Sequence, residues 1–307
     1  MFTESDLRNP AVFATIRKKE AEGIMKTLFL TGASGFLGRR IREALGERYR
    51  IAAPGHGDCD IADPEAVRRA VREAGADFVV HCAAVSDVAQ CAREPERSWR
   101  INVDGSLAVA RAAGEAGAKC VLCSSDQVYA GSAVTVPHRE DELLSPAPLY
   151  GREKLAAEWA CLAVNPDAVF LRLTWMYDAR AWPGEKGDFF RNLLAKRRAG
   201  EPLRFSTRDT RGLTDAGDVI RNLPAAFALP GGAYNFGSPA EGSVYECARE
   251  AFAAAGLDPA QIGEEASSPD RSRNLAMDPA RLNACGIRFP STAEALAEAL
   301  HRVEPGR

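Results

Sequence analysis

The sequence predicts an α/β fold built around a doubly wound parallel sheet, with a smaller and less regular C-terminal part. Apolar strand-like runs alternate with helical segments from residue 27 to about residue 173, as expected of parallel strands joined by crossover helices. The first run leads directly into a glycine-rich turn and a helix. After Asp178 prolines and glycines interrupt the alternation. The length of 307 residues suits one large or two small domains.

The expected elements follow one another in a regular order. A helix is expected to begin after Asp63, which is a typical N-cap and is followed by a proline at the first helical position and by the acidic Glu65. Gly75 is expected to end this helix. Strands are expected at residues 27–30, 49–53, 78–81, 119–123 and 168–173. Helices are expected after Gly35, after Asp63, over 94–117 and around Tyr150.

A glycine-rich turn, TGASGFLG at residues 31–38, follows the first strand and opens the first helix. In this context glycines let the backbone bend and approach a pyrophosphate, which the free amides of the helix start then bind. Gly38 would let the helix pack closely on the sheet. A turn that serves packing alone is the alternative. Strand and helix together favour dinucleotide binding, and with it the Rossmann form of the sheet.

Two further segments carry side chains suited to proton transfer. Ser125 ends an apolar strand, at the sheet edge where ligands bind, although a serine there also suits a turn cap. Tyr150 and Lys154 stand four residues apart in a predicted helix and share one face. An ammonium beside a phenol favours the phenolate, which lowers the tyrosine pKa from about 10. Such a tyrosine can exchange a proton with an alcohol or ketone.

In combination these segments resemble the extended short-chain dehydrogenase/reductase family, from Met25 nearly to the C-terminus. Asn102 and the HCAA segment at residues 81–84 also match that family. Within it the chain is most similar to the dTDP-4-dehydrorhamnose reductases. The stretches that carry this likeness are DIADP at 60–64, SSDQVY at 124–129, LTWMY at 173–177 and RLNACGIR at 281–288.

The resemblance implies a role for each matched residue. Tyr150 would donate a proton, Lys154 would lower its pKa and bond the nicotinamide ribose, and Ser125 would hold the reacting carbonyl. Asn102 would support a proton relay or the local structure. The implied cofactor-binding residues are Gly32, Ser34, Gly35, Phe36, Leu37, Gly38, Arg39, Asp60, Ile61, Cys82, Ala83, Ala84, Tyr150 and Lys154. The implied substrate-binding residues are Ser125, Asp126, Gln127, Trp175 and Arg211.

The expected cofactor is NADP(H), with NAD(H) as the alternative. NAD-specific sites carry an acid about 20 residues past the glycines, but the second strand ends in APGH at 53–56, without a carboxylate. Arg39 and Arg40 could neutralise a 2′-phosphate, or could simply be solvated. Cations at a helix start oppose the helix dipole, and this unfavourable placement favours a function for them.

Three regions are expected along the chain. Residues 1–24 form an N-terminal extension. The resemblance implies that residues 25–178 form the dinucleotide-binding domain, together with a returning segment near 213–240 that holds a strand at 233–237, so that this domain is interleaved with a smaller C-terminal one. The resemblance implies that residues 179–212 and 241–307 form a substrate domain.

Composition and charge argue against several classes of protein. A net charge of −3 gives no basic face for nucleic acid, and no apolar run reaches the ~20 residues that span a bilayer. The N-terminus is not a secretory signal, so a cytoplasmic location is expected. The expected partner is a small nucleotide-sugar substrate, and a homodimer is compatible with the sequence.

The eight cysteines and four histidines show no disulfide framework and no metal-ligand spacing. Cys120 and Cys123 form a C-x-x-C pair inside a predicted strand. Residues three apart in a strand point to opposite faces, so we expect these thiols not to meet. Both should be buried as small hydrophobic side chains.

The leading prediction is an NADP(H)-dependent oxidoreductase that reduces a nucleotide-linked 4-keto-6-deoxysugar. An NAD-dependent sugar-nucleotide epimerase or dehydratase is one alternative. Another is a non-catalytic cofactor-binding subunit, because the regulatory subunit of methionine adenosyltransferase carries the same family pattern. Gln127 and Asp178 depart from the reductases, which usually have an aromatic residue and a glycine there. The substrate is therefore less firmly indicated than the hydride chemistry.

Overall fold

The computed structural model describes residues 23–180, 187–265 and 273–303. The extension predicted for residues 1–24 lies outside this part of the chain, except for its last two residues. The described chain divides into two compact units. The first contains the residues up to Val128, Pro146–Arg172 and Leu223–Tyr234. The second contains Tyr129–Ser145, Leu173–Asn222 and the residues from Asn235 onward.

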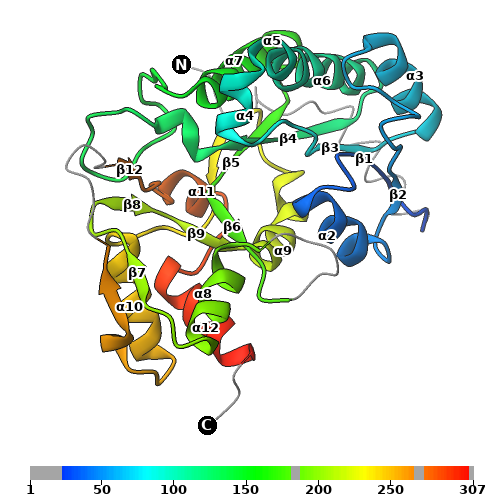
Figure 1. Ribbon diagram of the computed structural model, residues 1–307. Helices are drawn as coiled ribbons and strands as arrows, with labels where there is room; N and C mark the ends of the chain where they lie inside the picture. The colour runs from blue at the N-terminus through cyan, green and yellow to red at the C-terminus, as the bar shows by residue number, and fades with distance from the viewer. Residues whose placement is uncertain (1–22, 181–186, 266–272, 304–307) are drawn as a thin grey trace. The chain divides into compact units, whose positions relative to one another are not determined.

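A six-stranded sheet has the strand order β10-β5-β4-β3-β1-β2 (Figure 1). Its strands are β1 (Thr27–Thr31), β2 (Arg50–Ala52), β3 (Phe78–His81), β4 (Lys119–Ser125), β5 (Val169–Leu173) and β10 (Gly232–Phe236). The ladders of β1 with β2, of β1 with β3 and of β3 with β4 are parallel. The predicted doubly wound α/β sheet is confirmed. The chain runs outward from β1 in both directions, so the crevice at the carboxyl ends of β1 and β3 is the topological switch point.

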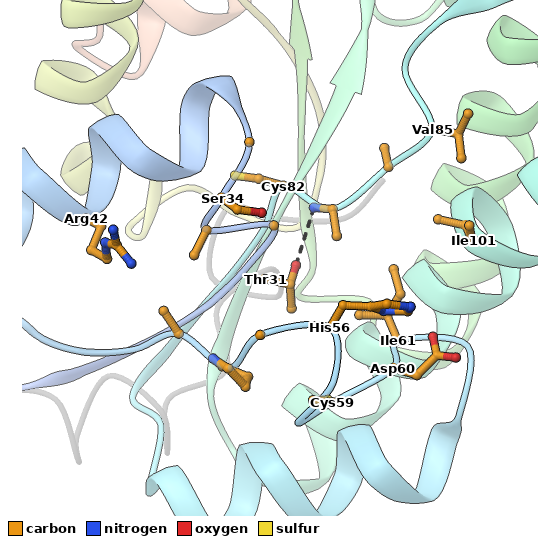
Figure 2. Close-up of a pocket in the computed structure, with 18 of the residues that line it drawn as sticks. Thr31, Ser34, Arg42, His56, Cys59, Asp60, Ile61, Cys82, Val85 and Ile101 are labelled. Atoms are coloured by element: carbon orange, nitrogen blue, oxygen red, sulfur yellow. Dashed lines mark hydrogen bonds between the residues drawn. The ribbon is translucent and has the colours of Figure 1, made fainter. Parts of the chain in front are cut away.

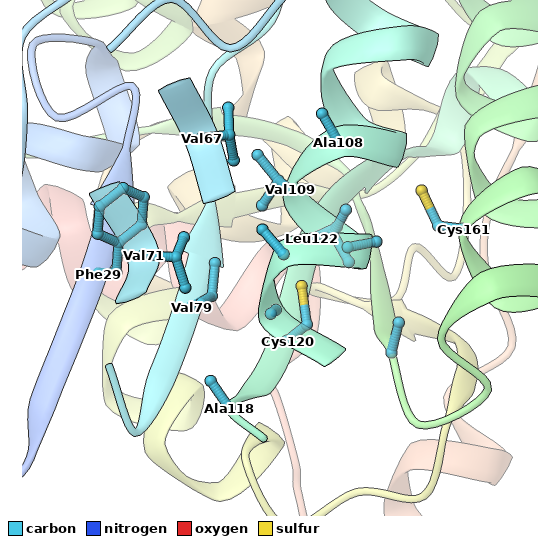
Figure 3. Close-up of a cluster of buried hydrophobic side chains, with 14 of the residues drawn as sticks. Phe29, Val67, Val71, Val79, Ala108, Val109, Ala118, Cys120, Leu122 and Cys161 are labelled. Atoms are coloured by element: carbon cyan, nitrogen blue, oxygen red, sulfur yellow. The ribbon is translucent and has the colours of Figure 1, made fainter. Parts of the chain in front are cut away.

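Helices cover both faces of the sheet in the first unit (Figure 1). They are α2 (Phe36–Leu45), α3 (Pro64–Ala74), α4 (Val88–Arg93), α5 (Pro95–Trp99), α6 (Gly105–Glu115) and α7 (Leu149–Val164). Side chains of α3, α6 and α7 form a core with Phe29, Val79 and Leu122 of the strands (Figure 3). Helix α2 lies on the other face, where its Ile41 is fully buried.

The helix after Asp63 begins and ends as its residues predict. The Asp63 carboxylate accepts hydrogen bonds from the amides of Glu65 and Ala66, with Pro64 as the first helical residue. Gly75 ends the helix with a φ of 59°, a left-handed conformation that glycine adopts readily. This short-range chemistry fixes where the helix lies between β2 and β3.

The single helix predicted over residues 94–117 is instead three pieces. Helix α5 passes into a π-helical turn at Arg100–Asp104, and α6 follows from Gly105. The turn contains Asn102, whose side chain is fully buried. A π-helical turn adds a residue to the helix and often marks a functional site. The hydrophobic period alone could not reveal it, because the apolar face continues through the turn.

The second unit consists of short parallel ladders and helices. Its ladders pair β6 (Trp175–Tyr177) with β9 (Leu213–Asp215), β7 (Leu203–Phe205) with β11 (Ile262–Glu264), and β8 (Asp209–Arg211) with β12 (Arg273–Leu275). Its main helices are α8 (Phe189–Arg198), α10 (Val244–Ala254), α11 (Ala280–Ala284) and α12 (Thr292–Val303), and α9 (Ala216–Ala226) precedes β10. Tyr177, Phe190 and Phe252 form the centre of its core. None of the helices in the described ranges has the length and apolar character needed to cross a membrane.

Candidate active site

A cavity of about 470 Å³ lies in the first unit at the carboxyl ends of β1, β2 and β3 (Figure 2). Three segments form most of its wall: the glycine turn after β1, the segment after β2 and the segment after β3. The lining residues are Thr31, Gly32, Ala33, Ser34, Gly35, Arg42, Ala53, Pro54, Gly55, His56, Cys59, Asp60, Ile61, Cys82, Ala83, Ala84, Val85, Arg97 and Ile101. The cavity occupies the switch point of the sheet, where open α/β sheets bind ligands.

The glycines of the turn are required by close backbone approaches. Gly32 has a φ of 68°, and a Cβ there would lie 2.6 Å from the amide nitrogen of Ala83. A Cβ at Gly38 would lie 2.1 Å from the carbonyl oxygen of Gly32. Gly38 therefore lets the helix approach the turn rather than the sheet, which corrects the expectation. Gly35 caps α2 without a side chain, so the first-turn amides remain available to an anion.

The structure divides the predicted cofactor-binding residues into two groups. Those that line the cavity are Gly32, Ser34, Gly35, Asp60, Ile61, Cys82, Ala83 and Ala84. Those that do not line it are Phe36, Leu37, Gly38, Arg39, Tyr150 and Lys154. Arg40, which was also considered for a 2′-phosphate, is fully buried and stacks on Phe36 with its Cζ 3.7 Å from the ring centroid. The two arginines after the glycine turn are therefore not the cations that line this cavity.

Two cationic residues of the wall, Arg42 and Arg97, were not among the predicted ones, and His56 at the end of the second strand also lines the cavity. Arg42 stands seven residues after Gly35, two helical turns on the same face, so the helical period could have identified it. Arg97 comes from α5, and no local pattern pointed to it. Arg42 gives the wall a positive charge, whereas the Arg97 guanidinium is paired with Glu94 at 2.5 Å.

The serine, tyrosine and lysine predicted for catalysis lie together in the first unit. Lys154 places its Nζ 5.7 Å from the ring centroid of Tyr150 and donates to the carbonyl oxygen of Cys123 at 2.9 Å. Ser125 shares a side-chain hydrogen bond with Tyr150 and donates to Asp126 Oδ1 at 3.1 Å. Helix α7 supplies the phenol and the ammonium, and the end of β4 supplies the hydroxyl. The arrangement can hold a carbonyl oxygen beside two hydroxyl donors.

Burial dominates the proton affinities of this group. Burial first, and then the negative charge of Asp126, raise the pKa of Tyr150 above its usual value, while the hydrogen bond with Ser125 acts in the opposite direction. Burial also lowers the pKa of Lys154. The expectation that Lys154 lowers the tyrosine pKa is therefore wrong for this structure. Tyr150 carries its proton at neutral pH, which is the state that a proton donor requires.

Asn102 joins the cavity wall to α7. Its Oδ1 accepts from the amide of Val85 at 2.8 Å, and its Nδ2 donates to the Val85 carbonyl at 2.9 Å. The same Nδ2 donates to Glu153 Oε2 at 2.7 Å, and the Ser98 hydroxyl donates to Glu153 Oε1 at 2.5 Å. Asn102 thereby holds the segment after β3 in register with the helix of Tyr150.

The cysteines are arranged only partly as predicted. Cys120 is buried in the sheet core (Figure 3) and does not meet Cys123, as the strand alternation predicts. Cys123 is not a buried hydrophobic side chain, however, because it is half-buried and its Sγ lies 3.6 Å from that of Cys82. Among the described residues no three metal-ligating side chains gather into a cluster.

The predicted substrate residues lie in both units. Asp126 and Gln127 follow Ser125, and the backbone amide of Gln127 donates a hydrogen bond to Ser125 Oγ at 3.2 Å. In the second unit Arg211 places its Cζ 5.1 Å from the ring centroid of Trp175. Trp175 also lines a cavity of about 260 Å³ within that unit. The residues of this second cavity include the aromatic Phe189 and Phe205 and the cationic Lys196 and Arg204.

The sequence profile of the RmlD substrate binding domain matches residues 25–304. The dTDP-4-dehydrorhamnose reductase of Mycolicibacterium smegmatis is 30% identical over 250 residues, which cover 80% of this chain and 74% of that protein. The dTDP-4-dehydrorhamnose reductase of Streptomyces griseus is 32% identical over 272 residues, which cover 84% of this chain and 87% of that protein.

A solved structure has the same fold as this chain. The crystal structure of dTDP-4-dehydrorhamnose reductase from Bacillus anthracis in complex with NADP superposes with a TM-score of 0.79. The superposition covers 91% of this chain and 99% of that one, at 22% sequence identity. The fold that the glycine turn and the alternating elements predict is therefore shared with a dinucleotide-binding protein.

Proposed function

This chain belongs to the RmlD substrate binding domain family, and we propose that it is an NADP(H)-dependent reductase of a nucleotide-linked 4-keto-6-deoxysugar. The observation that carries the proposal is the grouping of Ser125, Tyr150 and Lys154 in the unit that contains the glycine-turn cavity. The reductases of M. smegmatis and S. griseus supply the substrate class.

The larger cavity fits a dinucleotide. No side chain caps the first-turn amides of α2, so they are available to an anion. Gly32 lies against Ala83 and brings no side chain into the turn, which leaves room for a pyrophosphate. Arg42 adds positive charge to the wall, which favours the phosphorylated cofactor over NAD(H). The Bacillus anthracis reductase was crystallised with NADP, in agreement with this preference. When bound, the reduced nicotinamide would supply a hydride.

The chain's own residues would handle the proton. Tyr150 is buried and protonated, so it can give its proton to a carbonyl oxygen that becomes an alcohol. Ser125 can donate a hydrogen bond to the same oxygen and stabilise the negative charge that develops on it. Lys154, whose Nζ lies 5.7 Å from the Tyr150 ring centroid, would hydrogen-bond the nicotinamide ribose.

We further propose that the second unit binds the nucleotide part of the substrate. Its cavity combines aromatic faces for a base with Lys196 and Arg204 for phosphate oxygens. Arg211 beside Trp175 offers a planar fork of donors to a diphosphate. The boundaries of a substrate domain, a homodimer and a cytoplasmic location stay predictions.

The decisive experiment follows NADPH absorbance with a panel of nucleotide-linked keto-sugars, for wild type, Tyr150→Phe and Tyr49→Phe. Tyr49→Phe is the matched control, since Tyr49 packs against Phe78 and Phe227 in the same unit. We expect Tyr150→Phe to lower the rate about 100-fold or more, because it removes the general acid. The control should keep the wild-type rate.

Other outcomes would identify other functions. Conversion of the sugar without net NADPH consumption would indicate an epimerase or dehydratase. Cofactor binding without turnover on any keto-sugar would indicate a regulatory subunit. An undiminished rate in Tyr150→Phe would refute the role of Tyr150 as proton donor.

A further inference from the structure

Two thiols meet beside the larger cavity. The paired residues His81 of β3 and Leu122 of β4 are followed by Cys82 and Cys123, one step further along the two strands. The sulfur atoms of these cysteines lie 3.6 Å apart, and both side chains are half-buried. Cys82 lines the cavity (Figure 2), so a small solute that enters the cavity reaches Cys82.

The surroundings make the two sulfurs chemically unequal. The hydrogen bond with Cys82 lowers the pKa of Cys123, burial acts against it, and the positive charge of Lys154 lowers that pKa further. The same hydrogen bond raises the pKa of Cys82. Cys123 is therefore the better nucleophile, and Cys82 is the thiol placed to react with it afterwards.

Among the described residues no other two cysteines combine such a contact with such a difference in pKa. Cys120 and Cys161 are buried in the core, and burial raises the pKa of both. Cys285 is exposed at the C-terminal end of α11. Buried thiols without stabilisation of the thiolate are inert, so reactivity should concentrate at Cys123.

We propose that Cys82 and Cys123 form an oxidation site at which a hydroperoxide produces a disulfide, and that this disulfide weakens dinucleotide binding. The Cys123 thiolate attacks the peroxide, so that an S–O bond forms, the O–O bond breaks, and the departing oxygen takes a proton to give water or an alcohol. The Cys82 thiol then attacks the sulfenic sulfur; the S–S bond forms, the S–O bond breaks, and the hydroxide leaves with the Cys82 proton as water. Two thiols lose two electrons, and one peroxide gains them.

The backbone can accommodate the bond. Neighbouring strands lie about 4.8 Å apart, within the Cα separation of roughly 4.4–6.8 Å that disulfides require. The sulfurs must still close from 3.6 Å to about 2 Å, so Cys82 is drawn toward β4. The next residue, Ala83, already lies against Gly32, where a Cβ would be only 2.6 Å from its amide nitrogen. A shift of Cys82 is therefore transmitted to the glycine turn of the cofactor site.

The test treats the full-length protein with hydrogen peroxide and then reads three properties: linked peptides by non-reducing mass spectrometry, free thiols, and the dissociation constant of NADPH. We expect a linked pair of peptides that contains Cys82 and Cys123, a loss of two free thiols, and a rise of about tenfold in the dissociation constant. Dithiothreitol should reverse all three. Cys123→Ser should bind NADPH like the untreated wild type and keep its affinity after peroxide, and Cys285→Ser should respond like the wild type.

Two results would overturn the proposal. One is oxidation of Cys123 to a sulfinic acid without a link to Cys82. The other is a linked pair whose formation leaves NADPH affinity unchanged. The link itself does not depend on the proposed reductase activity, and the affinity change rests only on the proposed cofactor site. Failure of the keto-sugar assay and failure of this proposal are therefore distinguishable.

Discussion

Gly151 lies against the carbonyl oxygen of Gln127, so closely that a Cβ at position 151 would sit 2.2 Å from that oxygen. The glycine follows Tyr150 directly in α7, and Gln127 lies two residues beyond Ser125. The absence of a side chain at 151 thus allows the helix with the phenol and the ammonium to approach the segment with the hydroxyl. The spacing between the three proposed catalytic groups depends on this contact.

Gly151→Ala should separate Tyr150 from Ser125. The added methyl meets backbone rather than a flexible side chain, so the helix must shift, at a cost of about 1–3 kcal/mol in the free energy of unfolding. Turnover should fall more than stability alone explains. The control is Gly263→Ala, whose Cβ would make ordinary contacts of 3.7 Å or more and should change stability by less than about 0.5 kcal/mol. Urea unfolding measures the stability of each variant, and steady-state kinetics measure its turnover. Wild-type kinetics in Gly151→Ala would contradict the prediction.

His81 should make the protein sensitive to acid. Burial, and then the charge of Lys154, lower the pKa of His81 to about 3 from a usual 6.5. The unfolded chain therefore binds a proton that the folded chain does not, and stability is lost as the pH falls from about 6.5 toward 3. Between pH 6.5 and 5 the loss should be about 2 kcal/mol.

The neutral ring also fits its partners. Ser106 donates its hydroxyl to the Asn102 carbonyl and so accepts from His81 Nε2, which leaves Nδ1 to accept from Thr31. Urea unfolding at pH 7 and 5 of His81→Asn should show a smaller loss than the wild type. His301→Asn, at an exposed position, is the control for removal of an imidazole. Equal losses in wild type and His81→Asn would refute the assignment.

Arg42→Ala should raise the KM for NADPH about tenfold and change the KM for NADH little, because the lost guanidinium would contact only the 2′-phosphate. Arg39→Ala is the matched control from the same helix, since Arg39 does not line the cavity. Steady-state kinetics with NADPH and with NADH give the ratio of the two KM values for each variant. A larger effect of Arg39→Ala than of Arg42→Ala would restore the expectation drawn from sequence.

Arg211→Ala should raise the KM for the nucleotide-sugar about tenfold or more, with the KM for NADPH unchanged, because a bidentate donor to the diphosphate is lost. Arg249→Ala removes a similar arginine–aromatic contact in the same unit, where Arg249 Cζ lies 5.5 Å from the Tyr245 ring centroid. That control should leave both constants unchanged. An unaltered sugar KM in Arg211→Ala would exclude the diphosphate role.

Features that depend on neighbours in sequence could be predicted from the sequence. The strand at Phe78–His81 and the helix capped by Asp63 appear where short-range propensity and capping place them. Lys154 and Tyr150 share a face of one helix because the helical period requires it. The helical period also places Arg42 on the same helix face as Gly35, whereas the sequence prediction named Arg39, and a cofactor role for either residue stays a prediction.

Features that depend on distant neighbours could not be predicted. Nothing in the alternation of strand residues indicates that Cys123 would meet Cys82, because the strand order decides which strand adjoins β4. Nor could the spacing of Tyr150 and Lys154 reveal that burial raises the tyrosine pKa, since desolvation depends on everything packed around the ring.

The amino-acid sequence by itself determined the elements, the glycine turn and the set of side chains available for proton transfer, because these follow from interactions over a few residues. Only the tertiary structure decided which cations face the cavity, which thiols touch and how tightly Tyr150 holds its proton. Those properties arise from burial and from contacts between segments that the chain order keeps far apart.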